Sequence, residues 1–260
     1  MALKNIVFIH GMFVTNNCWD DWKKFFEEKG YECHAPAWPL KNASPGELRK
    51  KHPDVAGEGH VHLSDVIDVY EKFIRSLGDA PILIGHSMGG LIVQVLLNRG
   101  LGCCGVAIDS APPKGVITTK LSFLKANWPA LNPFSSKHTP LLLSKKQFQY
   151  AFADHLQGAG LDKAYECVVP QSKLIPRDTL GNIAAINYKT KKQPLLFVAG
   201  EKDKIIPSSL NRSNYKKYSS APSKTEFKEF PGRRHYLIND EGWGEIAAYI
   251  EEWLSKNCME

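Results

Sequence analysis

Ser87 is the residue of this chain whose surroundings most clearly indicate chemistry. It stands at the centre of the pentapeptide GHSMG at residues 85–89, which has the spacing G-x-S-x-G. An apolar run at residues 81–84 precedes this pentapeptide and a helical run at residues 91–97 follows it. The pattern predicts a sharp turn from a buried strand into a helix, with the serine hydroxyl exposed on the turn. We therefore interpret Ser87 as a candidate nucleophile.

A serine hydroxyl needs a base within hydrogen-bond reach before it becomes a good nucleophile at neutral pH. Among the nine histidines of the chain, His235 follows the last predicted strand, residues 225–230, just before the final helix. A loop at the carboxyl end of a parallel strand opens on the same edge of the sheet as the Ser87 turn. We predict that His235 is the general base. The base must be neutral to accept a proton. If the pKa of His235 is that of an unperturbed imidazole, activity should rise through about pH 6 to 7.

A third residue, an acid, should hold the imidazole tautomer and stabilise its positive charge. Asp203 follows the predicted strand at residues 194–199 and gives the chain order nucleophile, acid, base. Asp109, directly after the preceding strand, is the rival acid. Glu201 lies closer than Asp203 to the end of the strand at residues 194–199, but its place in the loop is less suitable for the acid. We predict that Asp203 is the acid.

Two backbone N–H groups are needed to stabilise the oxyanion of a tetrahedral intermediate. One is expected from Met88, the residue after the candidate nucleophile. The second is expected from the loop HGMF at residues 10–13, where Gly11 allows a close approach of the backbone. The amide of Met12 is the predicted donor.

Other histidines are given structural interpretations. His10 and His86 stand at the ends of predicted strands and are expected to be hydrogen-bonded structural residues. His60 and His62 form an H-x-H pattern, for which a metal ion would require a third ligand such as Asp65. No spacing in the sequence demands such a ligand set. We predict neither a metal ion nor a cofactor.

The elements that must position these residues alternate between strand and helix, which predicts a mostly parallel sheet of about six strands with helices on both faces. Several strands are uninterrupted apolar runs, typical of strands covered on both sides. The strands are expected at residues 5–10, 31–37, 81–85, 105–109, 194–199 and 225–230. The amphipathic helices are expected at about residues 18–29, 64–77 and 243–256.

Residues 113–190 interrupt this alternation with short helical pieces broken by prolines, and we predict a helical cap inserted within a single domain of residues 1–260. Residues 113–192 contain 12 Lys and Arg against 4 Asp and Glu, a net charge of +8. Either this is a solvated surface, or it attracts anionic substrates or acidic lipid surfaces. The large apolar residues of the segment either line an acyl pocket or form the cap's own core. They are Phe123, Trp128, Phe134, Leu141, Leu142, Leu143, Phe148, Tyr150 and Phe152.

Composition excludes several classes of protein. With 43% hydrophobic and 23% charged residues, the chain is typical of globular proteins. No apolar stretch approaches the roughly 20 residues of a membrane span, and the run at residues 6–9 is too short for a signal-peptide core. The six cysteines lack C-x-x-C spacing and are expected to be free thiols. We expect a cytoplasmic protein, and no nucleic-acid partner because no binding motif accompanies the lysines.

Taken together, the motifs resemble the α/β-hydrolase superfamily, with residues 10–13 as the oxyanion loop, 85–90 as the nucleophile elbow and 200–207 as the acid loop. The resemblance is strongest to capped, single-domain esterase-like members. Two departures are visible: the first two antiparallel strands of longer members are missing, and GRRH precedes the final helix where relatives commonly have a small residue before the histidine. Membership implies hydrolysis but no particular substrate.

The resulting hypothesis is a serine hydrolase that cleaves a small-molecule carboxylic ester through an acyl-enzyme. A serine at the elbow, in place of an aspartate, argues against dehalogenase or epoxide hydrolase activity. A lactonase, amidase, C–C bond hydrolase or perhydrolase would use the same residues. A ligand receptor of the same fold with slow turnover is the alternative from another class.

Overall fold

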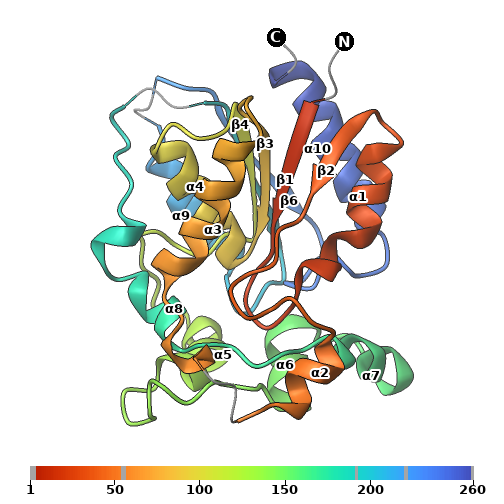
Figure 1. The fold of residues 1–260 in the computed structure, drawn as a ribbon, viewed down its shortest axis with the longest axis vertical. Helices are drawn as coiled ribbons and strands as arrows, with labels where there is room; N and C mark the ends of the chain where they lie inside the picture. Colours follow the sequence, from red (N-terminus) through yellow and green to blue (C-terminus); the bar gives the residue numbers. More distant parts are fainter. Residues whose placement is uncertain (1–3, 54–56, 191–192, 220–221, 259–260) are drawn as a thin grey trace.

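A six-stranded parallel sheet forms the centre of the computed structural model, which describes residues 4–53, 57–190, 193–219 and 222–258 (Figure 1). The strand order is β2-β1-β3-β4-β5-β6, and every neighbouring pair is parallel. The strands are β1 (Lys4–Ile9), β2 (Tyr31–His34), β3 (Ile82–His86), β4 (Cys104–Ile108), β5 (Leu195–Gly200) and β6 (Thr225–Phe230). The predicted fold class is confirmed.

Burial explains why these strands are apolar runs. All residues of β3, β4 and β5 are buried, whereas the edge strand β6 is mostly half-buried. The second strand is shorter than the predicted residues 31–37 and ends at His34. Pro36 follows, and a proline cannot donate a hydrogen bond to a neighbouring strand.

Helices cover both faces of the sheet (Figure 1). On one face lie α1 (Asp20–Glu27), which follows the 3₁₀ turn η1 (Asn16–Trp19), and α10 (Trp243–Asn257). On the other face lie α3 (Leu63–Ser76), α4 (Met88–Asn98) and α9 (Ser208–Lys216). The helices at the predicted positions 18–29, 64–77 and 243–256 are therefore present, with ends shifted by one to a few residues. Gly30 and Gly78, both with positive φ, follow α1 and α3 and end them.

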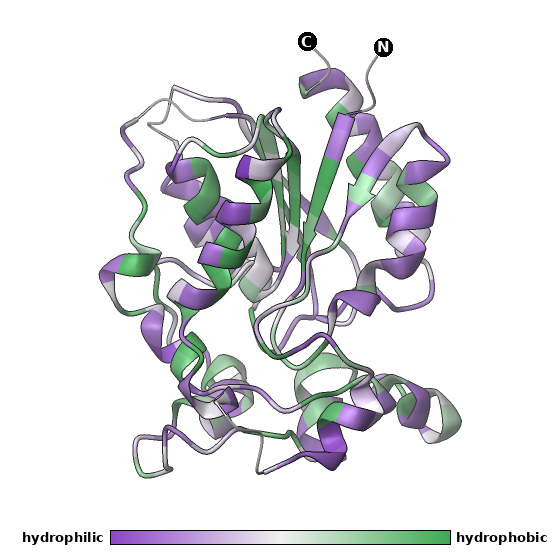
Figure 2. Ribbon diagram, viewed as in Figure 1, coloured by the Kyte–Doolittle hydropathy of each residue, from purple (hydrophilic) through white to green (hydrophobic). Residues whose placement is uncertain are grey.

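The two faces of the sheet carry separate hydrophobic cores. Under α1 and α10 the core contains Trp19, Trp22 and Phe26. The core on the opposite face continues beyond the sheet, where Phe148 and Phe152 belong to the same cluster as α3 and α4. In Figure 2 the central strands are coloured as hydrophobic, and the surrounding helices alternate between hydrophobic and hydrophilic residues.

Residues 113–190, which we call the inserted segment, connect β4 to β5. They contain α5 (Leu121–Leu131), α6 (Lys145–Phe152), α7 (Gly158–Glu166), α8 (Leu174–Asp178) and the 3₁₀ turn η3 (Asn182–Ala184). The only strand-like pairing within these residues is an isolated antiparallel bridge between Leu141 and Gln171. The segment lies at the carboxyl ends of the strands, beside the short helix α2 (Pro45–Lys50) (Figure 1).

A buried ion pair fastens the inserted segment to the loop after β2. Lys41 Nζ donates to Glu58 Oε1 at 2.8 Å, and each side chain is only 1% exposed. The same ammonium group donates to the carbonyl of Pro170 in the inserted segment. Removal of either charge would leave the other buried without a partner, which typically costs about 3–5 kcal/mol. The pair therefore ties Lys41 and Glu58 to the inserted segment.

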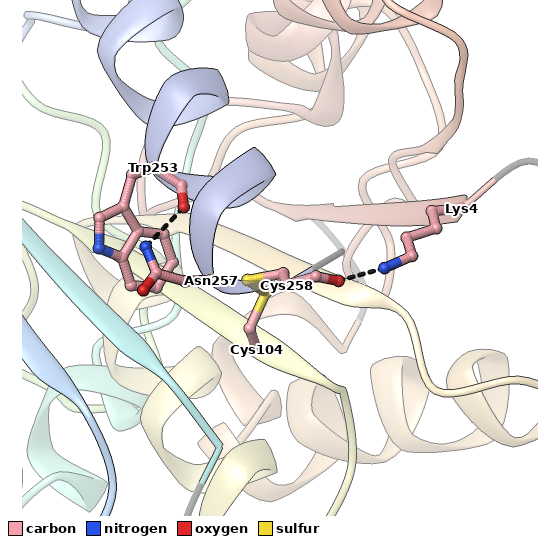
Figure 3. Close-up of a disulfide and its surroundings, with 5 residues drawn as sticks. All are labelled: Lys4, Cys104, Trp253, Asn257 and Cys258. Atoms are coloured by element: carbon pink, nitrogen blue, oxygen red, sulfur yellow. Dashed lines mark hydrogen bonds between the residues drawn. A yellow bond between two sulfur atoms is a disulfide. The ribbon is translucent and has the colours of Figure 1, made fainter. Parts of the chain in front are cut away.

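One expectation about the cysteines is wrong. Cys104, at the start of β4, and Cys258, just after α10, form a disulfide across a Cα–Cα distance of 6.1 Å (Figure 3). Lys4 Nζ donates to the carbonyl of Cys258 and holds the start of β1 beside this bond. The four remaining cysteines, Cys18, Cys33, Cys103 and Cys167, are free. The two bonded cysteines are 154 residues apart, so only the fold brings them together.

No helix within the described residues is both long enough and apolar enough to cross a bilayer. The cytoplasmic location stays a prediction. The Cys104–Cys258 bond counts against it, because disulfides are rare in reducing compartments.

Candidate active site

Ser87 lies on the predicted turn between β3 and α4. Its backbone has φ 59° and ψ −120°, a strained conformation for a residue with a side chain. The turn is tight because strand and helix nearly touch: a Cβ atom on Gly85 would lie 2.2 Å from the carbonyl oxygen of Gly89. A Cβ atom on Gly89 would lie 2.0 Å from the carbonyl oxygen of Ile9. Only glycine fits at either position, which is the packing that the G-x-S-x-G pattern predicts.

His235 and Asp203 are brought together from two different loops. Asp203 follows β5 and His235 follows β6, and Nδ1–H of His235 donates to Asp203 Oδ2 at 2.6 Å. Asp203 Oδ1 accepts the backbone N–H groups of Ile205 and Ile206, each at 2.8 Å. Both side chains of the pair are inaccessible to solvent. The acid is thus held rigidly against the imidazole through Nδ1, which leaves Nε2 as the other ring nitrogen of His235.

The rival acid Asp109 does not contact His235 through a hydrogen bond. Its Oδ1 accepts the N–H of Gly200 at 2.8 Å, while Oδ2 has no hydrogen-bond partner among the described residues. Burial, and next the charge of Asp203, raise the pKa of Asp109 well above its usual value. Burial also raises the pKa of Asp203, but hydrogen bonds from the N–H groups of Ile206 and Ile205 oppose that effect.

Two neighbouring buried carboxyl groups cannot both be ionised cheaply. Asp203 accepts three N–H hydrogen bonds and Asp109 accepts one, so we assign the negative charge to Asp203 and the proton to Asp109. Glu201 is exposed and accepts the N–H of Gly232, away from His235. The geometry favours Asp203 among the three acids that the sequence left in competition.

His235 is neutral at neutral pH. Burial lowers the pKa of its imidazole to about 3. Nε2 of His235 has no hydrogen-bond partner within the described part of the chain, and hydrogen bonds of this kind are often completed only when substrate is bound. A general base must be unprotonated, so the activity that was expected to rise through about pH 6 to 7 is now expected to rise at lower pH.

The basic loop before His235 is anchored at two points. Arg233 Nη2 donates to Glu245 Oε2 at 3.0 Å, at the start of α10. Arg234 forms an ion pair with Asp154 of the inserted segment. These contacts hold the GRRH loop that leads into His235, and sequence reasoning assigns no role to either arginine.

The two predicted oxyanion donors lie beside Ser87. Met88 is the first residue of α4, so its N–H group has no partner within the helix. Gly11 approaches so closely that a Cβ atom there would lie 2.8 Å from Cβ of Ser87, and Met12 follows it at the same cavity. Phe13, the next residue, has a positive φ of 66°, a conformation that sequence reasoning did not foresee.

His10 and His86 are hydrogen-bonded in the interior. Nδ1 of His10 donates to the carbonyl of Gly11 at 2.9 Å, and its ring stacks on Trp38. Nε2 of His86 donates to the carbonyl of His235 at 2.9 Å. Both histidines thus have the structural roles expected for them, and His86 also supports the loop of the candidate base.

His60 and His62 do not converge on one point. The His60 ring stacks on His138, whereas Nδ1 of His62 lies 2.9 Å from Asp178 Oδ2. Asp65, the ligand considered for them, accepts the backbone N–H of His62. In the described residues, the one group of three potential ligands with mutually close atoms is His86, Asp109 and His235. The hydrogen bonds that these residues already make favour proton handling over metal binding.

A mostly apolar cavity opens at Ser87. Met12, Phe13 and Met88 line it from the sheet side. Of the apolar residues for which two roles were open, four line this cavity: Phe123, Leu141, Leu143 and Phe152. Phe148 is buried in the core, Leu142 and Tyr150 pack against that core, and Trp128 and Phe134 are exposed. The segment thus supplies a pocket wall and also part of the core that it shares with α3 and α4.

The fold is that of an α/β hydrolase, and comparison with known proteins establishes the family. A family model described as "Alpha/beta hydrolase family" matches residues 6–249. This chain belongs to the α/β hydrolase family.

Individual relatives are distant. A curated protein of Mycoplasma genitalium described as esterase/lipase 3 is 20% identical over 98% of this chain and 89% of its own. The crystal structure of a Paleococcus ferrophilus monoacylglycerol lipase covers 97% of this chain and 94% of its own, with 20% identity and a TM-score of 0.67. Tomato methylketone synthase I, at 16% identity, covers 99% of this chain and 100% of its own with a TM-score of 0.72. Similarity at this level shows a shared fold.

Buried neutral histidines predict acid-sensitive stability. Burial lowers the pKa of His10 and of His235 to about 3 and that of His86 well below its usual value. Because these pKa values are lower in the folded state, the stability they contribute is present above about pH 6.5 and is lost as pH falls toward 3. The raised pKa values of Asp109 and Asp203 oppose part of this effect. We expect the free energy of unfolding to fall as the pH is lowered from 7 to 5.

Urea unfolding at pH 7 and pH 5 measures this slope. His10→Asn should reduce the slope by about 1.4 kcal/mol per pH unit, the share of one proton. His138→Gln, at an exposed position, is the matched control and should leave it unchanged. An unaltered slope in His10→Asn would remove this histidine from the explanation.

Proposed function

We propose that this protein is a serine hydrolase that cleaves carboxylic esters through an acyl-enzyme intermediate. The single observation that carries the proposal is the Asp203–His235 pair, buried and joined at 2.6 Å, on the strand ends next to the strained Ser87 turn. The relatives described as an esterase/lipase and a monoacylglycerol lipase support the same class of reaction.

In the proposed mechanism, Ser87 Oγ attacks the acyl carbon while Nε2 of His235 accepts the hydroxyl proton. Asp203 holds Nδ1–H and stabilises the imidazolium that forms. The amides of Met12 and Met88 donate to the oxyanion of the tetrahedral intermediate. His235 then protonates the leaving alcohol, and a water molecule activated by the same histidine releases the acid and regenerates Ser87.

We propose that the inserted segment, within one domain of residues 1–260, acts as a cap over this site. It contributes Phe123, Leu141 and Phe152 to the cavity, and these side chains suit an uncharged acyl group. The mechanism requires no cofactor and no metal ion. A lactone, amide or C–C bond substrate would use the same residues, as would a perhydrolase.

The test is covalent labelling. A fluorophosphonate reacts at useful rates only with an activated serine, so intact-mass analysis should show one adduct per chain, mapped to Ser87 by peptide sequencing. Ser87→Ala should abolish the adduct, whereas Ser110→Ala, at a buried serine that donates to the carbonyl of Ala111, should retain it. An adduct that persists in Ser87→Ala would refute the assignment of the nucleophile.

Burst kinetics on a chromogenic ester separate the enzyme from the receptor alternative. Continuous turnover after the first equivalent of product supports the hydrolase. A stoichiometric burst followed by almost no turnover would instead identify a ligand receptor that retains the triad.

A further inference from the structure

The outer side of α5 exposes large apolar side chains. Leu121 is 81% exposed, Leu124 49% and Trp128 55%, and their spacing of three and four residues puts them on one side of the helix. Ile117, before the helix, is 81% exposed, and Phe134, after it, is 92% exposed. We call these five residues the outer α5 surface. A helix of a globular protein ordinarily has polar residues on its solvent side, so this surface requires an explanation.

The opposite side of α5 packs against the rest of the molecule. Ala126 and Ala130 are buried and line the cavity at Ser87, together with Phe123. The helix is therefore apolar on both sides, and burial against the rest of the molecule accounts for only one of them. The five side chains of the outer α5 surface are between 49% and 92% exposed, so the rest of the described chain leaves most of this surface uncovered.

The charged side chains of the chain segment that carries this surface have one sign. From Asp109 to Asp154 the sequence has no acidic residue between the two ends, but it has six lysines: Lys114, Lys120, Lys125, Lys137, Lys145 and Lys146. All six are exposed, and Lys145 pairs with Asp162 of α7.

A groove between α5 and α6 has both apolar side chains and lysines along its walls. It is lined by Trp128, Lys125, Lys146 and Tyr150, and the ammonium group of Lys125 lies 4.2 Å from the centre of the Tyr150 ring. Apolar and aromatic side chains beside lysines are the composition of helices that lie in a membrane interface.

We propose that the outer α5 surface docks on an anionic lipid surface, with its apolar side chains in the headgroup region and Lys120, Lys125 and Lys146 against acidic headgroups. Charge decides between the possible occupants. A second copy of the chain packed face to face would bring two lysine-rich surfaces together, which like-charge repulsion opposes. An acidic lipid layer satisfies both the apolar and the cationic parts of the surface.

Docking would place the cavity next to the lipid, because the inner side of α5 lines it. If the proposed ester hydrolysis holds, this arrangement favours substrates presented at a lipid surface over esters free in solution. The docking itself does not rest on catalysis, so Ser87→Ala should bind vesicles as the wild type does.

The experiment is flotation of the full chain with phosphatidylcholine vesicles, with and without phosphatidylglycerol. We expect binding only when the acidic lipid is present, and weaker binding as salt is added. Each lysine near an acidic surface contributes roughly fivefold in affinity, so Lys120→Gln/Lys125→Gln should weaken binding on the order of twentyfold. Lys216→Gln/Lys217→Gln, two exposed lysines at the end of α9, removes the same charge and should bind as the wild type does.

The apolar part is tested with Leu121→Ser/Trp128→Ser, which should lose vesicle binding. Both positions are at least half exposed, so we expect only a small change in melting temperature, which is measured alongside. Several results would overturn the proposal: no binding to acidic vesicles, equal binding to neutral ones, or undiminished binding by Leu121→Ser/Trp128→Ser. A dimer in sedimentation that this variant dissolves, without vesicle binding by the wild type, would assign the surface to a second copy instead.

Discussion

Asp203→Asn should lower kcat by about four orders of magnitude while the protein remains folded. The asparagine keeps the shape of the side chain and can still accept the N–H groups of Ile205 and Ile206. It no longer offers a carboxylate to Nδ1–H of His235, so the imidazole loses its preferred tautomer and the partner for its positive charge. Steady-state kinetics on a chromogenic ester, together with an unchanged melting temperature, measure the effect.

Asp109→Asn is the matched control. We assign the proton of the carboxyl pair to Asp109, and asparagine imitates a protonated carboxyl group while it still accepts the N–H of Gly200. The loss in kcat should therefore stay below about tenfold, because no group that contacts the substrate changes its charge. If Asp109→Asn were the more severe of the two variants, the catalytic acid would belong after β4 and the assignment to the loop after β5 would be wrong.

His235→Ala should reduce kcat by at least about three orders of magnitude, because removal of the base leaves a serine hydroxyl with no proton acceptor. In the wild type, kcat/KM should reach its plateau well below pH 6.5, since burial lowers the pKa of His235 and the neutral form acts as base. The pH profile of the wild type and the turnover of His235→Ala both test whether His235 accepts the proton of Ser87.

His86 provides the comparison, because its ring lies 4.6 Å from that of His235. His86→Gln can still donate to the carbonyl of His235, because its amide nitrogen reaches the position of Nε2, and this variant should cost far less than His235→Ala. Comparable losses would show that the two imidazoles act together, and near-normal turnover in His235→Ala would mean that another histidine is the base.

The parts of this molecule that sequence reasoning predicts well are those set by neighbours along the chain. The buried strands are recognisable because residues covered on both faces must all be apolar, as in β3 and β5. The turn at Ser87 is recognisable because two glycines at fixed spacing are the only residues that fit there. Loop positions after β5 and β6 then place Asp203 and His235 on one edge of the sheet.

Features that depend on contacts between distant residues were out of reach. The sequence favours Asp203 over Asp109 only by its place in the chain, whereas the hydrogen bond from His235 to Asp203 depends on how two loops meet. The Cys104–Cys258 disulfide joins residues that are 154 positions apart in the sequence. Nothing in the sequence distinguishes Lys41 and Glu58, which form a buried ion pair, from ordinary surface charges. The exposure of Trp128 and Phe134 was equally invisible, since large apolar residues are by default expected in a core.

Lys4 and Cys258 touch at the amino ends of the strands, and the Ser87 turn lies at the carboxyl ends (Figures 1 and 3). Lys4 and Cys258 thus lie on the side of the molecule that faces away from the cavity. Either end can serve as a tether to a bead or a fused carrier that leaves substrate access open. A short linker between them would also permit circular permutation, with new ends opened at an exposed loop and the sheet order unchanged.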